Sequence, residues 1–478
     1  MKNIILFVTM SLFATISNAQ DFDRIVYWVH GLGGDDAAFS QVANATTYTG
    51  APGYPARRAY SNQIGYVNQS YSLNSAAGYV NGQIFNQNNF NLNGYANNFI
   101  IAHSQGGLVS RALDKYYSDF PFLGARRVGG LVTFGTPHQG ARILNNIGLF
   151  NSFISSGCVD LAAGVLEEAI PNGFFIDLII PNNIVSTVTQ PICALAGEAA
   201  PLAFNDFTQP ITDDYRVGAP ALAELNNFQS NIPKVAFYGI EDEDNVLWKI
   251  LYNVKDRKPN SFPAFEADDD NKLVLAKNAN VLKYQAKVTF WQNQWSQLGS
   301  AYCSGWQWFF APAWCIYNDG QVNSNRNKAI KNRDAWAKGA NWWTTANDKF
   351  RTITGALEVT ETPISVYECN CTSYDYDGNQ VGGDWIELGD ENGCPSYGWL
   401  TGCTPTGNFV PSVRYNTVSN PSDGIVLQES AQNFPGAAFN REMIGSNHQQ
   451  MRNDSNTKKR LIELWRGDYG NYFITATR

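Results

Sequence analysis

The segment FIIAHSQGG, from Phe99 to Gly107, constrains the fold of this chain most strongly. An apolar run leads into Ser104, and the small residues Ala102 and Gly106 stand two positions before and after it. A strand that turns sharply into a helix needs this pattern, because bulky side chains there would collide with the neighbouring strand and helix. Such a turn exposes the serine hydroxyl in strained backbone. The segment therefore predicts a strand–turn–helix unit with Ser104 as candidate nucleophile.

Two more apolar runs end in glycine-rich loops. Residues 24–29 lead into His30-Gly31-Leu32-Gly33-Gly34, and residues 128–134 lead into Gly135-Thr136-Pro137-His138-Gln139-Gly140. In parallel α/β sheets, chemistry collects at the carboxyl ends of the strands. We therefore expect residues 22–142 to form the first half of a parallel sheet with crossover helices, including one from about Gln105 to Tyr117.

These motifs resemble those of the secreted bacterial lipases of the α/β-hydrolase superfamily. The matching segments are the His30-Gly31 loop, the elbow at 102–107, Gly135-Thr136-Pro137-His138 and the later Ser422-Asp423-Gly424-Ile425-Val426. The resemblance covers residues 22–145, 230–245 and 410–466. It implies an α/β-hydrolase fold: a mostly parallel sheet with flanking helices. The remaining residues predict a cap insertion and a second, largely helical insertion that contains disulfides.

A serine hydroxyl needs a neighbouring base to act as a nucleophile, and histidine is the usual one. The chain has 4 histidines. In the resembling family, His30, His103 and His138 do not fill this role. The remaining histidine, His448, lies on a loop before the amphipathic segment 458–466, and we identify it as the candidate base.

A carboxylate must orient the imidazole, and Asp423 is our candidate. The chain order Ser104, Asp423, His448 is that of α/β hydrolases. An alternative acid group follows the predicted strand at 234–239 and comprises Glu241, Asp242 and Asp244. The motif around Asp423 favours Asp423 over this group.

Two backbone N–H groups should stabilise the oxyanion that forms during attack. The elbow supplies the N–H of Gln105, the residue after the serine. By resemblance, the second donor is the N–H of Leu32. Several lipases of this type also hold a structural calcium through an aspartate two residues after the histidine. That position is Gln450 here, so no calcium ligands and no required cofactor are predicted.

The N-terminus has the features of an export signal. Lys2 is followed by the short apolar stretch 4–16 and by a plausible cleavage site at Ser17-Asn18-Ala19. We expect a secreted or periplasmic protein with no transmembrane segment. The predicted organisation is a signal peptide at 1–19, a first core part at 20–142, an apolar cap or lid at 143–230, a core strand at 231–245, a helical hairpin plus Cys-rich β insertion at 246–410, and the acid and histidine region of the core at 411–478.

Eight cysteines in an exported chain indicate disulfides. Local pairing predicts Cys158–Cys193, Cys303–Cys315, and Cys369 and Cys371 with Cys394 and Cys403. Within the second insertion we expect helices near 269–298 and 325–357 and short strands and turns over 359–410. The aromatic loop between the helices would either dock on a lipid or polymer surface or form a local core.

The net charge of −8 and pI near 5.1 argue against a nucleic-acid partner. The sequence favours an exported serine ester hydrolase that cleaves lipid-like acyl esters, most of all acylglycerols, at a lipid–water interface. An esterase, phospholipase or polyester hydrolase with the same three residues remains open. So does a catalytically inactive adhesion or binding protein. The oligomeric state is not predicted.

Overall fold

The computed structural model describes most of the chain in several stretches. These are residues 24–34, 38–43, 59–66, 71–87, 98–120, 126–169, 209–255, 267–298, 309–375, 377, 379–381, 384–396 and 401–474. The predicted signal peptide, Cys193, Cys303 and residues 170–208 of the predicted cap lie outside them. The described residues fall into two compact units, one ending at Ala356 and resuming at Pro421, the other spanning Leu357–Asn420.

The first unit contains a sheet of six strands in the order β2-β1-β3-β4-β5-β9. Every neighbouring pair runs parallel. The strands are β1 (Arg24–Val29), β2 (Ala59–Ile64), β3 (Phe99–His103), β4 (Leu131–Phe134), β5 (Lys234–Ile240) and β9 (Phe439–Ile444). The predicted α/β class and parallel sheet are therefore confirmed, as are the strands at 24–29 and 234–239.

Both faces of this sheet are covered, which explains why its four central strands β1, β3, β4 and β5 are mostly apolar. Tyr27 and Val29 of β1 belong to one buried cluster, whereas Val26 and Trp28 belong to another. This alternation is the two-residue period of a strand with a core on each side. The first cluster includes residues of α2 (Leu73–Gln87), α3 (Gln105–Asp119) and α10 (Val246–Lys255), and the second includes residues of α15 (Ser455–Arg466).

Shorter helices connect these elements. They are α4 (Arg142–Asn145), α8 (Pro210–Asp213), α9 (Pro220–Asn227), α14 (Gln428–Gln432) and the 3₁₀ turns η2 (Gln450–Arg452) and η3 (Asn471–Phe473). Gly355 ends the long helix α13 (Pro312–Thr354) and Gly467 ends α15, both in the left-handed conformation that suits glycine after a helix. Asp454 caps α15 by accepting a hydrogen bond from the Thr457 N–H.

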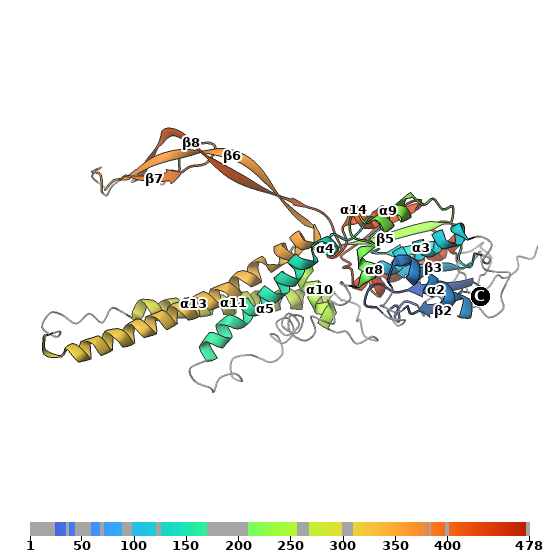
Figure 1. Cartoon of the computed structure of the whole chain (residues 1–478), viewed down its shortest axis with the longest axis horizontal. Helices are drawn as coiled ribbons and strands as arrows, with labels where there is room; N and C mark the ends of the chain where they lie inside the picture. The colour runs from blue at the N-terminus through green and yellow to red at the C-terminus, as the bar shows by residue number, and fades with distance from the viewer. Residues whose placement is uncertain are drawn as a thin grey trace, which may run out of the picture. The chain divides into compact units, whose positions relative to one another are not determined.

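Three long helices lie within the two predicted insertions. They are α5 (Ile147–Ala169), α11 (Ala267–Gln297) and α13 (Pro312–Thr354), and α13 packs on both of the others (Figure 1). Trp342 stacks on Phe153 of α5, and Trp336 meets Tyr284 of α11 edge to face. Gly157 allows this packing, because a Cβ there would lie 2.5 Å from the Trp342 indole nitrogen. Helix α13 begins at Pro312, whereas the sequence predicted that the second helix of this insertion would begin near residue 325.

The second unit is a long antiparallel ribbon. Strand β6 (Leu357–Ser373) pairs along its length with β8 (Thr401–Ser419), and β7 (Trp385–Leu388) adds to the other side of β6. The expectation of short strands and turns over 359–410 is therefore wrong. Residues 411–419, which we assigned to the core, are the last part of β8.

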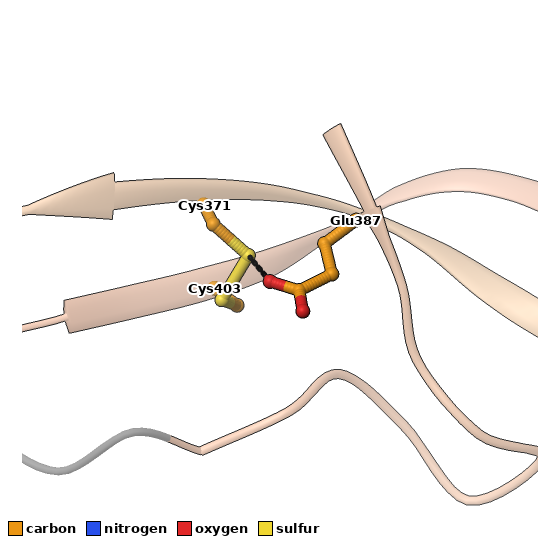
Figure 2. Close-up of side chains that lie close together, drawn as sticks. All are labelled: Cys371, Glu387 and Cys403. Carbon is orange, nitrogen blue, oxygen red and sulfur yellow. Dashed lines mark hydrogen bonds between the residues drawn. A yellow bond between two sulfur atoms is a disulfide. The ribbon is translucent and has the colours of Figure 1, made fainter. Parts of the chain in front are cut away.

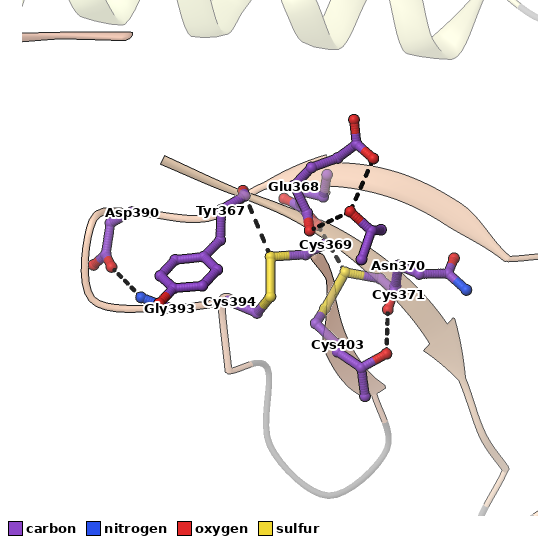
Figure 3. The surroundings of a disulfide bond; sticks show 12 residues. Tyr367, Glu368, Cys369, Asn370, Cys371, Asp390, Gly393, Cys394 and Cys403 are labelled. Carbon is purple, nitrogen blue, oxygen red and sulfur yellow. Dashed lines mark hydrogen bonds between the residues drawn. A yellow bond between two sulfur atoms is a disulfide. The ribbon is translucent and has the colours of Figure 1, made fainter. Parts of the chain in front are cut away.

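Two disulfides cross-link this ribbon. Cys371 and Cys403 are direct cross-strand partners, and Glu387 of β7 lies beside them (Figure 2). Cys369 pairs with Cys394, which lies beyond β7 (Figure 3). The predicted pairing of this cysteine group is thus confirmed and its connectivity resolved. The predicted Cys158–Cys193 and Cys303–Cys315 pairs each include a cysteine outside the described residues.

Candidate active site

Ser104 sits between β3 and α3 in strained backbone. It is the one non-glycine residue of the described chain with positive φ, at φ 54° and ψ −130°. Its N–H donates to the Phe134 carbonyl of β4 at 2.9 Å, which fixes the turn to the sheet. A Cβ at Gly106 would lie 2.3 Å from the His30 carbonyl oxygen. The small residue in the sequence pattern is therefore a steric requirement of this turn.

The structure brings His448 to Ser104 from the loop between β9 and η2. The His448 Nε2 lies 2.9 Å from the Ser104 Oγ, and its Nδ1 lies 2.8 Å from the Asp423 Oδ2. An Nδ1–H that donates to the carboxylate leaves Nε2 free to accept the serine proton. In addition, the His448 N–H donates to the Asp423 carbonyl at 2.8 Å, so backbone and side chain both join the two residues.

Asp423 is held by the turn that follows the ribbon. Its Oδ1 accepts hydrogen bonds from the N–H groups of Ile425 at 3.0 Å and Val426 at 2.7 Å. Its own N–H donates to the Val426 carbonyl, and Gly424 adopts φ 95° at the tip of the turn. One carboxylate oxygen is thus fixed by the backbone while the other faces His448. The Ser-Asp-Gly-Ile-Val motif encodes this turn.

The alternative acids point elsewhere. Glu241 forms a buried ion pair with Lys249 of α10. Asp242 accepts hydrogen bonds from Asn245 and from the Asp244 N–H. The structure therefore brings Asp423, rather than this group, to the imidazole of His448.

The other three histidines are buried in separate hydrogen-bonding roles. His103 Nε2 lies 2.7 Å from the His448 carbonyl oxygen, so a neutral His103 donates to the backbone of the candidate base. His138 contacts Arg111 and the Thr133 hydroxyl. Burial, reinforced by nearby positive groups, lowers the pKa of His103 and of His138 well below the usual range. Both are therefore neutral near pH 7.

The glycine-rich loop after β1 lies directly against the elbow. A Cβ at Gly31 would be 2.7 Å from the Ser104 Cβ and 3.0 Å from the His103 Nδ1. Leu32, the predicted oxyanion donor, is the next residue of this loop. Gln105, the other predicted donor, is the first residue of α3. Leu32 follows Gly31 and Gln105 follows Ser104, and Gly31 and Ser104 lie against each other at the elbow.

A hydrogen-bonded network holds the Gln105 side chain. Its Nε2 donates to the Tyr66 hydroxyl at 3.1 Å, and its Oε1 accepts from the Tyr215 hydroxyl at 2.8 Å. Tyr66 donates in turn to the His30 carbonyl at 3.1 Å and stacks on the His30 ring, with centroids 4.4 Å apart. The network joins the two loops that carry Leu32 and Gln105. Sequence reasoning missed Tyr66 and Tyr215, which belong to no local motif.

The described residues offer no free metal site. One group has metal-ligating side chains close together, Cys371, Glu387 and Cys403, but its two sulfurs form a disulfide (Figure 2). Gln450 stands at the calcium-ligand position of the resembling lipases. Its Oε1 accepts the Asn447 N–H at 2.9 Å, so it stabilises the loop that carries His448.

Among the described helices, none has the length and apolar character needed to cross a bilayer.

Comparisons with known proteins place this site in context. The family described as palmitoyl protein thioesterase matches residues 25–254. No curated protein matches the sequence significantly. The chain is similar to a phospholipase from Legionella pneumophila at 12% sequence identity, over 46% of this chain and 39% of that one, with a TM-score of 0.28. It is similar to a thioesterase from Streptomyces coelicolor at 13% identity, over 47% of this chain and 69% of that one, with a TM-score of 0.24. It is also similar to a lipase from Bacillus licheniformis at 10% identity, over 87% of this chain and 77% of that one, with a TM-score of 0.25.

The structural match to the Legionella phospholipase covers less than half of that protein's chain. The family match supports a hydrolase of esters or thioesters. The parallel sheet and its flanking helices are those of an α/β-hydrolase fold.

Proposed function

We propose that this chain is an exported serine hydrolase that cleaves the carboxylic esters of lipids, most of all acylglycerols. The observation that carries the proposal is the continuous relay from the Ser104 Oγ through the His448 imidazole to the Asp423 carboxylate. The positive φ of Ser104 adds to it, because strain at a serine of this kind is typical of a nucleophile at a strand-to-helix turn.

In the proposed mechanism, Ser104 attacks the acyl carbon while His448 takes the hydroxyl proton at Nε2. The Asp423 carboxylate accepts a hydrogen bond from the Nδ1–H and stabilises the imidazolium. The N–H groups of Leu32 and Gln105 donate to the oxyanion, and His448 returns its proton to the departing alcohol. Water then attacks the acyl-enzyme with His448 again as base, which releases the fatty acid. This chemistry requires no cofactor.

The preference for lipid esters is supported by composition rather than by a described pocket. Residues 143–230 are rich in apolar side chains and repeatedly interrupted by proline, as suits a cap over the nucleophile. Export is supported by the signal-like N-terminus and by the cross-linked cysteines of the ribbon.

A second candidate is a hydrolase of long-chain acyl thioesters. The match to the palmitoyl protein thioesterase family favours it, since that match covers the predicted nucleophile and the predicted oxyanion donors. The same relay would serve, because thioester hydrolysis also passes through an acyl-serine and an oxyanion.

One substrate panel tests both proposals. Hydrolysis rates are measured for p-nitrophenyl esters from acetate to palmitate, for an emulsified triacylglycerol and for palmitoyl-coenzyme A, with the wild type beside Ser104→Ala and His448→Ala. The lipase proposal expects a long-chain ester preference, triacylglycerol hydrolysis, and loss of both in each variant. A rate on the thioester far above every oxygen ester would favour the second candidate.

The inactive binding protein is the remaining alternative. A fluorophosphonate probe that labels the wild type but not Ser104→Ala would exclude it. Absence of both labelling and hydrolysis in a folded wild type would overturn the enzyme proposal altogether.

A further inference from the structure

Helices α11 and α13 pack together (Figure 1). Aromatic and aliphatic side chains are exposed just before α13 and in its first turns. Phe309 is 82% exposed, Trp314 56% and Tyr317 63%. Phe310 and Ile316 are exposed as well. The sequence left two alternatives for this region, a docking surface and a local core. Side chains this accessible do not form a core, so the described part of the aromatic region is a surface. We call Phe309, Trp314, Ile316 and Tyr317 the aromatic tip.

Charged side chains are sparse at the start of α13 and in the last turns of α11. Residues 288–298 of α11 and its end carry none, and residues 309–325 carry only Asp319. Charged side chains begin immediately beyond, with Arg326, Lys328, Lys331 and Arg333 on α13 and Lys283 and Lys287 on α11. An exposed helix end normally carries charges, because they keep it soluble. The segregation therefore indicates a surface that favours an uncharged or dipolar environment over water.

The chemistry of the tip distinguishes among its occupants. Tryptophan, tyrosine and phenylalanine are the side chains that favour the boundary between lipid headgroups and acyl chains. The tip itself carries no basic side chain and the chain as a whole has a net charge of −8, so the four tip residues offer no electrostatic attraction to an anionic membrane. An uncharged aromatic end on an acidic protein therefore suits a zwitterionic lipid surface, bound through apolar contact.

We propose that the aromatic tip inserts into the interface of zwitterionic phospholipids and holds the enzyme on a lipid surface. The proposal rests on the proposed function, since a lipid hydrolase must work where its substrate aggregates. It assigns this role to the helix pair of the second insertion and not to the predicted cap. Because apolar insertion drives the binding, its strength should change little with salt, in contrast to binding through basic side chains.

The test measures partitioning of the full-length chain onto phosphatidylcholine vesicles by co-sedimentation. A Ser104→Ala background prevents hydrolysis from altering the vesicles. Adding Phe309→Gln, Trp314→Gln and Tyr317→Gln should weaken partitioning about tenfold or more, since three exposed aromatic side chains lose their apolar contact. Partitioning of the Ser104→Ala background with its tip intact should persist in 0.5 M NaCl, at roughly the strength seen at low salt.

A matched control changes three exposed aromatic residues elsewhere in the first unit, Tyr71, Tyr79 and Phe120, to glutamine. It should bind vesicles like the background. In active protein, the tip variant should hydrolyse soluble p-nitrophenyl butyrate at the wild-type rate but lose activity on vesicles and emulsions. The soluble-ester rate also separates the two proposals, because absence of that activity in the wild type refutes the enzyme and leaves the binding result intact.

Three results would overturn the proposal. The first is unchanged partitioning of the tip variant. The second is binding that 0.5 M NaCl abolishes, which would indicate basic side chains as the contact. The third is a wild-type oligomer that dissociates in the tip variant, measured by light scattering in the absence of lipid. That outcome would make a second copy of the chain the occupant of the tip.

Discussion

Replacing Gly31 by alanine should slow catalysis although every side chain of the proposed relay is retained. The added Cβ would lie 2.7 Å from the Ser104 Cβ, 3.0 Å from the His103 Nδ1 and 3.2 Å from the His103 carbonyl oxygen. Ordinary carbon–carbon contacts are about 3.5 Å or longer. The elbow is fixed in place, since Ser104 is buried between β3 and α3 in a strained conformation and its N–H is bonded to the Phe134 carbonyl of β4. The Gly31 loop must therefore move away by roughly 0.8 Å.

That displacement is enough to lose a hydrogen bond. A donor placed about 2.9 Å from the oxyanion would move to about 3.7 Å, beyond useful hydrogen-bond range. Leu32 follows Gly31 directly and would move with it. Loss of one oxyanion donor typically lowers kcat about 100- to 1000-fold. The substitution thus tests a backbone donor that no side-chain truncation can remove.

The assay is kcat on p-nitrophenyl butyrate, together with the rate of fluorophosphonate labelling and the melting temperature. Gly78→Ala is the control, because a Cβ at that site on α2 meets nothing within 4 Å. It should leave kcat unchanged and raise the stability by up to about 1 kcal/mol, as alanine does in a helix interior. A folded Gly31→Ala protein with kcat within about threefold of the wild type would refute the assignment of Leu32 as donor.

Three further predictions address the acid, the buried histidines and the ribbon. Asp423→Asn should lower kcat about 10⁴-fold while the protein still melts cooperatively, because the amide no longer selects the Nδ1–H tautomer; kinetics beside a circular dichroism melt would check it. His103 and His138 stay neutral when folded but accept protons when unfolded, so stability should fall by about 1.4 kcal/mol per histidine for each pH unit below about 6.5, measured by urea unfolding between pH 7.5 and 5.5. Removing the Cys371–Cys403 disulfide by two serine substitutions should destabilise the ribbon by about 2–4 kcal/mol and make it sensitive to limited proteolysis, with esterase activity retained.

The parts of the fold that the sequence predicted well are those in which backbone geometry restricts residue choice. Position 106 accepts only glycine without a shift of the backbone, because the His30 carbonyl oxygen lies where a Cβ would be. Asp423 lies in a turn that needs glycine at the next position, where φ is 95°. Such restrictions leave short motifs, so the strands and the proposed relay could be located before any contact was known. Because the chain has only 4 histidines, few residues were candidates for the base.

The sequence predicted β structure in this insertion but not the length of the strands β6 and β8, because these strands lack the usual signal. Strands are recognised when one face is buried and alternate residues are apolar. Most side chains of β8 are instead exposed, so pairing along the strand, rather than burial, defines it. Proline at positions 405 and 411 is also atypical of a strand interior, although an edge strand such as β8 tolerates it.

Long-range polar contacts set a second limit. Tyr66 and Tyr215 lie 39 and 110 residues from Gln105 in sequence, yet their hydroxyls hold the two ends of its side-chain amide. A buried amide that lost either partner would keep an unsatisfied polar atom, which costs about 1–3 kcal/mol. The backbone N–H of Gln105 is a proposed oxyanion donor, and Tyr66 also donates to the His30 carbonyl on the loop that carries Leu32. Losing a tyrosine hydroxyl would therefore disturb the contact between the two segments that carry the proposed donors. The residues that position the proposed chemistry are therefore constrained by three-dimensional contact alone, whereas those that perform it are also constrained by their local turns. That difference explains why the sequence located Ser104, Asp423 and His448 but not the tyrosines beside them.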